Sequence, residues 1–160
     1  MSENPYQAPN ATIAPKNTLP GPLWKAVGIG VAIDIGGTIL MSFIATLFYS
    51  MSLAAEGSSA SDVQSAMTAL DPLSPFALLT SILGLAMSVI GGYWCAVIAN
   101  RTTYLAPTLM AVGSLVVAFA LGGLSQSWAL TLFMAALSVA AVYLGASLAI
   151  KKLAGDARGR

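Results

Sequence analysis

Four long apolar runs constrain the fold of this chain more than any other feature of its sequence. They span 24, 24, 21 and 23 residues, at Ala26–Tyr49, Phe76–Ala99, Tyr104–Leu124 and Trp128–Ile150. About 20 apolar residues in a helix suffice to cross roughly 30 Å of hydrocarbon. The last three runs are separated by short polar segments, which place consecutive helices side by side in opposite directions. The pattern predicts an all-α membrane protein, a four-transmembrane-helix antiparallel bundle.

The composition agrees with a protein dissolved in lipid. Hydrophobic residues make up 57% of the chain and charged residues only 8%, whereas soluble domains carry about 25% charged residues. A surface so poor in charge is poorly solvated by water, so the lipid bilayer is the first partner that we expect. The net charge of +1 leaves no basic excess for nucleic acid.

The apolar runs divide the chain into three parts. Residues 1–22 form a proline-rich tail without apolar periodicity, which predicts disorder. Residues 23–150 form the membrane domain, and residues 151–160 form a basic tail. Ser74 and Pro75 are typical of a helix start. The predicted helices cover about 23–49, 75–99, 104–124 and 127–150, with an outer loop at 50–74.

The outer loop has helical periodicity of its own. Ser61 and Gln64 resemble a capping box, and Val63, Met67 and Leu70 recur at helical spacing. We therefore expect a short amphipathic outer helix over about residues 61–70. A lid resting on the bundle is the favoured interpretation of this helix, and a docking element for a partner is the alternative.

The basic residues predict the orientation in the membrane. All seven fall on one side of the predicted spans, at Lys16, Lys25, Arg101, Lys151, Lys152, Arg158 and Arg160. The opposite loops contain no basic residue. Because Lys and Arg are retained on the cytoplasmic side, both termini are expected in the cytoplasm. The first run far exceeds the 7–15 residues of a signal-peptide core, which favours a retained helix over a cleaved leader.

The sequence offers little material for catalysis. It contains one cysteine, Cys95, and no histidine. The usual ligands of zinc and haem, and the usual bases of nucleophilic triads, are therefore scarce. We expect no catalytic residues, no metal site and no cofactor, and we interpret the chain as a non-enzyme.

Asp34 is the most informative single residue, because it interrupts the first apolar run. It lies about 12 Å from the cytoplasmic edge of that run, at 1.5 Å per residue. A lipid-facing charge there costs about 2.5–3.5 kcal/mol, so the carboxyl should face the bundle interior. Counting equal depth along the other helices predicts a polar layer of Asp34, Thr38, Tyr93, Ser114 and Tyr143, with Tyr143 as the preferred hydroxyl partner. A structural hydrogen bond is favoured over a proton or cation relay, which ordinarily needs several titratable groups.

Small residues repeat at every fourth position of the second run, at Gly84, Ser88, Gly92 and Ala96. Such a stripe lets helix backbones approach closely in a membrane. Packing within the chain is the favoured interpretation, and contact with a second copy or another membrane protein is the alternative.

Two fragments carry a resemblance. Asn4-Pro5-Tyr6-Gln7-Ala8-Pro9 resembles the N-terminal motif of many small, uncharacterised bacterial inner-membrane proteins, and Gly91-Gly92-Tyr93-Trp94-Cys95-Ala96 resembles a Gly-Gly-Tyr-x-x-Ala helix end in such four-helix proteins. The resemblance implies a multi-pass protein of the bacterial inner membrane and transfers no activity. From the residues we expect an accessory, assembly or scaffolding role through helix contacts. The alternative is an oligomeric transporter or channel subunit that uses Asp34.

Overall fold

The fold is helical throughout the part of the chain that the computed structural model describes, residues 20–121 and 128–158. Residues 1–19 of the predicted disordered tail lie outside this part. The elements are α1 (Leu23–Val31), the π-helical turn η1 (Ala32–Gly36), α2 (Gly37–Ala55), α3 (Ala60–Thr68), α4 (Pro75–Ala99), α5 (Leu105–Ala120) and α6 (Trp128–Arg158). The predicted all-α class is confirmed.

The first helix is longer than predicted. α1, η1 and α2 form one continuous helix, Leu23–Ala55, of 33 residues. It passes the expected end at residue 49 because the next six residues include neither glycine nor proline. Gly57, with a φ of 89°, ends it. The Gly57 amide donates to the Ala54 carbonyl (3.0 Å) and the Ser58 amide to the Leu53 carbonyl (3.1 Å), which satisfies carbonyls left free at the helix end.

The outer helix α3 forms, with a different cap from the predicted one. The Asp62 amide donates to Ser59 Oγ (3.3 Å), and the Ser59 amide donates to the Asp62 carboxylate (3.0 Å). The predicted capping box at Ser61 and Gln64 was therefore wrong, because this reciprocal pair already satisfies the free amides two residues earlier. The helix spans residues 60–68 and packs against α2. The stripe residues Val63, Met67 and Leu70 are half-buried.

α4 begins and ends at the predicted residues, 75 and 99. Ser74 Oγ accepts a hydrogen bond from the amide three residues later (3.3 Å), and Pro75 occupies the first turn, where its missing N–H is not needed. Asn100 stops the helix in a left-handed conformation (φ 46°). The Gly21 amide donates to the Ala99 carbonyl (3.0 Å), so the segment before α1 caps the end of α4.

α5 and α6 differ from their predicted bounds at the ends. The predicted junction between helices 104–124 and 127–150 falls mostly on residues 122–127, outside the described residues. α6 runs on through much of the predicted basic tail to Arg158. Lys151, Lys152, Leu153 and Ala154 are good helix formers, and nothing in this stretch breaks the helix before that point.

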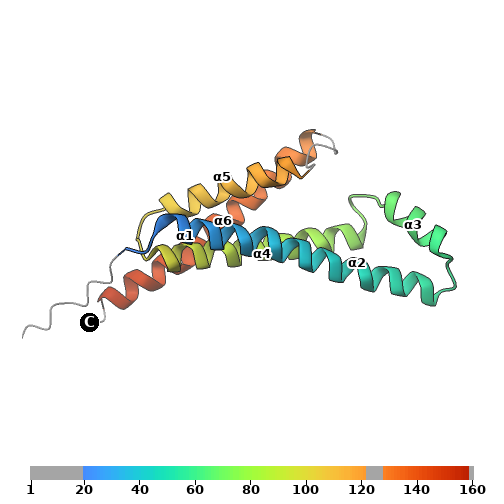
Figure 1. The fold of residues 1–160 in the computed structure, drawn as a ribbon, viewed down its shortest axis with the longest axis horizontal. Coiled ribbons are helices and arrows are strands. Elements are labelled where there is room, and N and C mark those ends of the chain that lie inside the picture. Colours follow the sequence, from blue (N-terminus) through green and yellow to red (C-terminus); the bar gives the residue numbers. More distant parts are fainter. Residues whose placement is uncertain (1–19, 122–127, 159–160) are drawn as a thin grey trace, which may run out of the picture.

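Figure 1 shows α1–α2, α4, α5 and α6 following one another in alternating directions. Lys25, Arg101, Lys151 and Lys152 consequently lie at one end of the molecule, called here the basic end. The opposite end, called here the acidic end, carries Glu56, Asp62 and Asp71.

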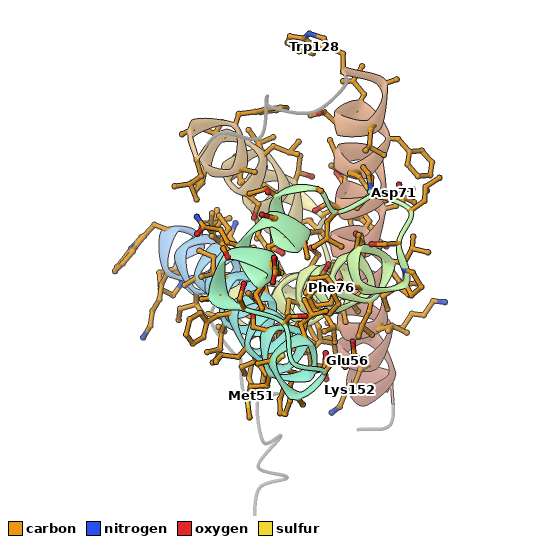
Figure 2. The ribbon with its side chains drawn as sticks, turned by 90° about the vertical axis from the view of Figure 1, so that its right-hand side faces the viewer. Met51, Glu56, Asp71, Phe76, Trp128 and Lys152 are labelled. Carbon is orange, nitrogen blue, oxygen red and sulfur yellow. The ribbon has the colours of Figure 1, made fainter. Side chains whose placement is uncertain are left out.

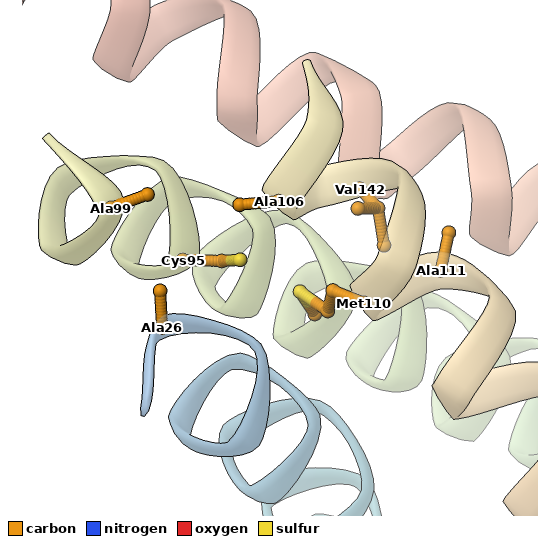
Figure 3. Close-up of a cluster of buried hydrophobic side chains, with 7 residues drawn as sticks. All are labelled: Ala26, Cys95, Ala99, Ala106, Met110, Ala111 and Val142. Carbon is orange, nitrogen blue, oxygen red and sulfur yellow. The ribbon is translucent and has the colours of Figure 1, made fainter. Parts of the chain in front are cut away.

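The helices pack tightly at the basic end and separate towards the acidic end (Figure 1). The main apolar cluster lies in the basic half (Figure 3) and contains Ala26, Cys95, Ala99, Ala106, Met110, Ala111 and Val142. In contrast, α2 contains no buried residue and contacts neither α5 nor α6. Figure 2, viewed from the acidic end, shows Trp128 at the start of α6 far from Met51 in α2.

Glycines permit the closest helix contact, between α4 and α6. A Cβ on Gly92 would collide with the carbonyl oxygen of Val142, and a Cβ on Gly145 would collide with that of Val89. The two backbones therefore touch directly, which only glycine allows at these positions.

Within the described residues, three helices are long and apolar enough to cross a membrane: Leu23–Ala55, Pro75–Ala99 and Trp128–Gly155. α5 is apolar but has only 16 residues, about 24 Å at 1.5 Å per residue. Large apolar side chains point outward along these helices, among them Phe43, Val116 and Phe133, which are 62%, 61% and 59% exposed. Such a surface suits a solvent of lipid, and the chain has the character of a membrane protein.

Candidate functional site

A cavity of about 540 Å³ occupies the space between the separating helices. Residues from all four long helices line it. Those of α5 and α6 come from the half of the helix nearer the acidic end, and those of the first helix come from its middle. Its walls combine aliphatic side chains with an unusual number of hydroxyls: Ser42, Thr38, Thr80, Ser81, Ser88, Ser114, Thr131 and Ser138. Hydroxyl groups of four helices thus gather around one cavity.

The carboxyl group of Asp34 lies at the inner end of this cavity. Asp34 is only 4% exposed. Ser88 of α4 donates a hydrogen bond to Asp34 Oδ1 at 2.6 Å, a length typical of a hydroxyl on a carboxylate. Ser88 Oγ also lies 3.4 Å from Ser138 Oγ of α6. A chain of polar groups thereby connects three helices.

Asp34 is the central residue of the π-helical turn η1. A π turn inserts one extra residue into an α-helix, is rare, and recurs at functional sites. Close packing surrounds this turn: a Cβ on Gly91 of α4 would come within 2.8 Å of the Gly30 carbonyl oxygen and 3.3 Å of Asp34 Cβ. The absence of a side chain at Gly91 is what lets the acid-bearing turn lie against α4.

Ser114 of α5 is a second buried polar group on the cavity wall. It is 7% exposed, and its hydroxyl has no hydrogen-bond partner. The hydroxyls of Thr80 and Ser81, in contrast, donate to carbonyls of their own helix. A buried hydroxyl without a partner costs about 1–3 kcal/mol. The hydroxyl of Ser114 is therefore able to form a hydrogen bond with a bound ligand.

The cavity is closed towards the basic end by apolar packing. Met110 is fully buried there, and its side chain lies so close to Gly30 and Gly91 that added Cβ atoms would clash with it (2.7 Å in both cases). No Lys or Arg lines the cavity; the described basic residues lie beyond this packing or outside it. The site therefore carries an acidic group, is closed towards the basic end, and is open elsewhere.

The structure divides the predicted polar layer. Asp34, Thr38 and Ser114 line the cavity together, whereas Tyr93 and Tyr143 do not. The expectation of Tyr143 as the partner of Asp34 was wrong: its hydroxyl lies 2.8 Å from Thr108 Oγ1 of α5. A residue's position along its helix does not fix the direction in which its side chain points around the helix axis. The side chain of Tyr143 points towards α5 and not towards Asp34.

The partner that depth counting missed, Ser88, was present in the sequence as a member of the small-residue stripe. A different pattern identifies it. Hydroxyl-bearing residues recur at helical spacing on one face of each helix, at 38 and 42, at 80, 81 and 88, and at 131 and 138. Such a polar face inside an apolar helix indicates the cavity lining.

The stripe itself packs inside the chain. A Cβ on Gly84 would contact the Thr38 side chain at 3.4 Å. Gly92 touches Val142, as described above, and Ala96 is buried with Ala146 and Ala149 of α6. The stripe is therefore occupied by α2 and α6 of the same chain.

The comparisons with protein-family models, with curated proteins and with solved structures found no match. Among the described residues, no group of three or more His, Cys, Asp or Glu could hold a metal ion. The described groups that the cavity offers to a ligand are one carboxyl group, several hydroxyl groups and an apolar wall.

Proposed function

We propose that the chain is a four-span protein of the bacterial inner membrane with both termini in the cytoplasm. The charge distribution supports this orientation, because the basic end retains Lys and Arg and the acidic end has none. α5 is the shortest span, and tilting neighbours or a locally thinned bilayer accommodates its length. In this orientation the cavity opens towards the outer side.

We propose further that the protein is non-catalytic and binds a small ligand in this cavity, as a subunit of a transport system. One observation carries the proposal: a cavity of about 540 Å³, lined by all four long helices, ends on the buried carboxyl group of Asp34. Small-molecule sites have volumes of roughly 300–1,000 Å³ and combine apolar walls with a few polar groups. An acid inside a membrane domain ordinarily marks a ligand or ion pathway.

A cavity that is open on one side and closed on the other fits one state of an alternating-access cycle. The packed cluster around Met110 then acts as the inner gate. Four of its seven buried residues are alanines and one is a flexible methionine, so the fully buried contact surface of this gate is made mostly of small side chains.

Thiol labelling tests both the orientation and the cavity. A membrane-impermeant maleimide applied from the outer side should label Ser138→Cys, because Ser138 lines the open cavity. Wild-type protein is the control, since Cys95 is fully buried on the closed side. Leu132→Cys, on the outward face of the same helix (Leu132 is 62% exposed), should also stay unlabelled because lipid covers it.

Reporter fusions after Arg160 and within the 56–62 loop should report cytoplasm and exterior respectively. Labelling of Ser138→Cys only from the cytoplasmic side, with reversed fusions, would contradict the orientation. Failure of Ser138→Cys to react from either side in folded protein would contradict the binding cavity.

The accessory or assembly role is the second candidate, and α2 is the feature that favours it. Over 19 residues α2 has no buried residue, and apolar side chains such as Phe43 and Phe48 are exposed, so the face of α2 turned away from α4 is open to a helix of another protein or of a second copy. Co-purification in mild detergent tests this role. Loss of a co-purifying membrane protein on Phe43→Ala, with the cavity still labelled, would support it.

A further inference from the structure

We infer that the ligand of this cavity is a primary amine with an apolar body, whose ammonium group binds at Asp34 and Ser114. The inference rests on the proposed binding function and names the chemical class of its ligand. It follows from the charge, the hydrogen-bonding capacity and the walls of the cavity, taken in turn.

The charge argument begins with the isolation of Asp34. Asp34 is buried, at the 4% exposure given above, and buried charges in proteins are ordinarily paired. Ser88 donates one hydrogen bond to it, but a hydroxyl carries no charge. No Lys or Arg is among the residues that line the cavity. A cationic ligand therefore supplies the counter-charge that the chain does not.

The hydrogen-bonding groups favour an ammonium that still carries N–H donors. Ser88 occupies Oδ1 of Asp34 and leaves Oδ2 as an acceptor. Ser114 of α5 lines the same cavity and has a buried hydroxyl oxygen without a partner. A primary ammonium offers three donors, enough for both acceptors and one more hydroxyl of the lining.

The walls disfavour a quaternary ammonium. Sites for quaternary cations use aromatic cages, in which several rings face the methyl groups. Of the residues that the structure describes, Phe119 is the only aromatic one that lines this cavity. Above the polar end the wall is aliphatic, formed by Ile35, Ile39, Leu85, Leu115 and Met134. This arrangement fits a ligand with a charged amino group at one end and a hydrocarbon body at the other.

The experiment compares three probes of nearly equal shape on the full-length protein in phosphatidylcholine nanodiscs. The probes are 2-phenylethylamine, its neutral analogue 2-phenylethanol, and the trimethylammonium derivative of the amine. Isothermal titration calorimetry at neutral pH measures binding. The amine should bind at least about tenfold more tightly than either analogue, as expected for a charged hydrogen-bonded pair in a buried site.

Two variants locate the binding group. Asp34→Asn keeps the size of the side chain and an acceptor for Ser88 but removes the charge, and should bring the amine-to-alcohol affinity ratio close to one. Ser114→Ala should weaken amine binding several-fold, by the loss of one hydrogen bond to a charged donor. Ser147→Ala is the matched control. Ser147 is a serine of a membrane helix, α6, that lies outside the cavity and donates to the Leu144 carbonyl, and its replacement should change nothing.

Equal binding of all three probes, unchanged by Asp34→Asn, would overturn the amine assignment and leave the proposed binding function intact. Preferential binding of the trimethylammonium probe would overturn it as well. So would a saturable heat from sodium chloride alone, abolished by Asp34→Asn, with none from the amine. The thiol labelling of Ser138→Cys is independent of any probe, so loss of that labelling, and not weak probe binding, identifies failure of the proposed function itself.

Discussion

Replacing Gly145 with alanine should destabilise the protein, whereas the same replacement at Gly28 should not. Both glycines lie in long apolar helices, and they look alike in the sequence. In the structure, a Cβ on Gly145 would meet backbone atoms of α4, with the Val89 carbonyl carbon at 2.8 Å and the Tyr93 amide nitrogen at 2.9 Å. A Cβ on Gly28 would meet nothing within 4 Å.

The expected magnitudes follow from these contacts. Backbone atoms cannot rotate out of the way as a flexible side chain can, so Gly145→Ala must push α4 and α6 apart. Overpacking of this kind costs about 1–3 kcal/mol. Gly28→Ala adds a methyl group in open space and improves helix propensity, by up to about 1 kcal/mol.

Titration with sodium dodecyl sulfate, followed by tryptophan fluorescence in mixed micelles, measures the free energy of unfolding of each variant. Gly92→Ala adds a further check, because Gly92 faces the same contact from the other helix. Combined with Gly145→Ala it should cost less than the sum of the two single changes, because helices already pushed apart by one methyl group leave room for the second. Equal stability of the Gly145→Ala and Gly28→Ala proteins would refute the close α4–α6 contact.

The remaining predictions concern smaller features. Ser88→Ala should lower the free energy of unfolding by about 1 kcal/mol, because it removes the hydroxyl that donates to Asp34. Ser147→Ala, assayed the same way, should leave the stability unchanged. An unchanged stability of Ser88→Ala would contradict the Ser88–Asp34 hydrogen bond. Ser59→Ala should raise the amide exchange rates of α3, since it removes the cap, which is typically worth about 1 kcal/mol; exchange rates unchanged from wild type would contradict the cap. The hydrogen bonds from the Ser59 side chain and backbone lower the pKa of Asp62 below its ordinary value of 3.8. The stabilisation of α3 by the Asp62 carboxylate is therefore complete at a pH above the ordinary pKa and is lost as the pH falls through the lowered pKa. Amide exchange rates of α3 that do not change with pH in this range, after correction for intrinsic exchange rates, would contradict this role of Asp62.

What the sequence determined by itself is the set of properties that depend on composition and local order. Four apolar runs and a shortage of charge indicate a lipid solvent whatever the detailed packing. The start of α4 followed from Ser74 and Pro75, because capping residues act within a few positions of the helix end. Even local rules can fail where two caps compete: Ser59 and Asp62 formed the cap two residues before the predicted one.

The level of a residue along its helix could be counted from the sequence, but the direction of its side chain around the helix axis could not. Residues at one level can point to any side, and a helix turns by about 100° per residue. The π turn at Asp34 adds one residue and shifts the phase of everything that follows it. Tyr143 was expected to face Asp34 and lies instead beside Thr108, while Ser88 faces Asp34.

The cavity depended on tertiary structure entirely. The same helices that touch through Gly92 and Gly145 near the basic end separate towards the acidic end, and no local pattern specifies where two backbones part. Separation arises from the sum of side-chain sizes across facing helices, which is a property of pairs distant in the chain. Only that packing places Asp34 and Ser114 on the wall of one cavity.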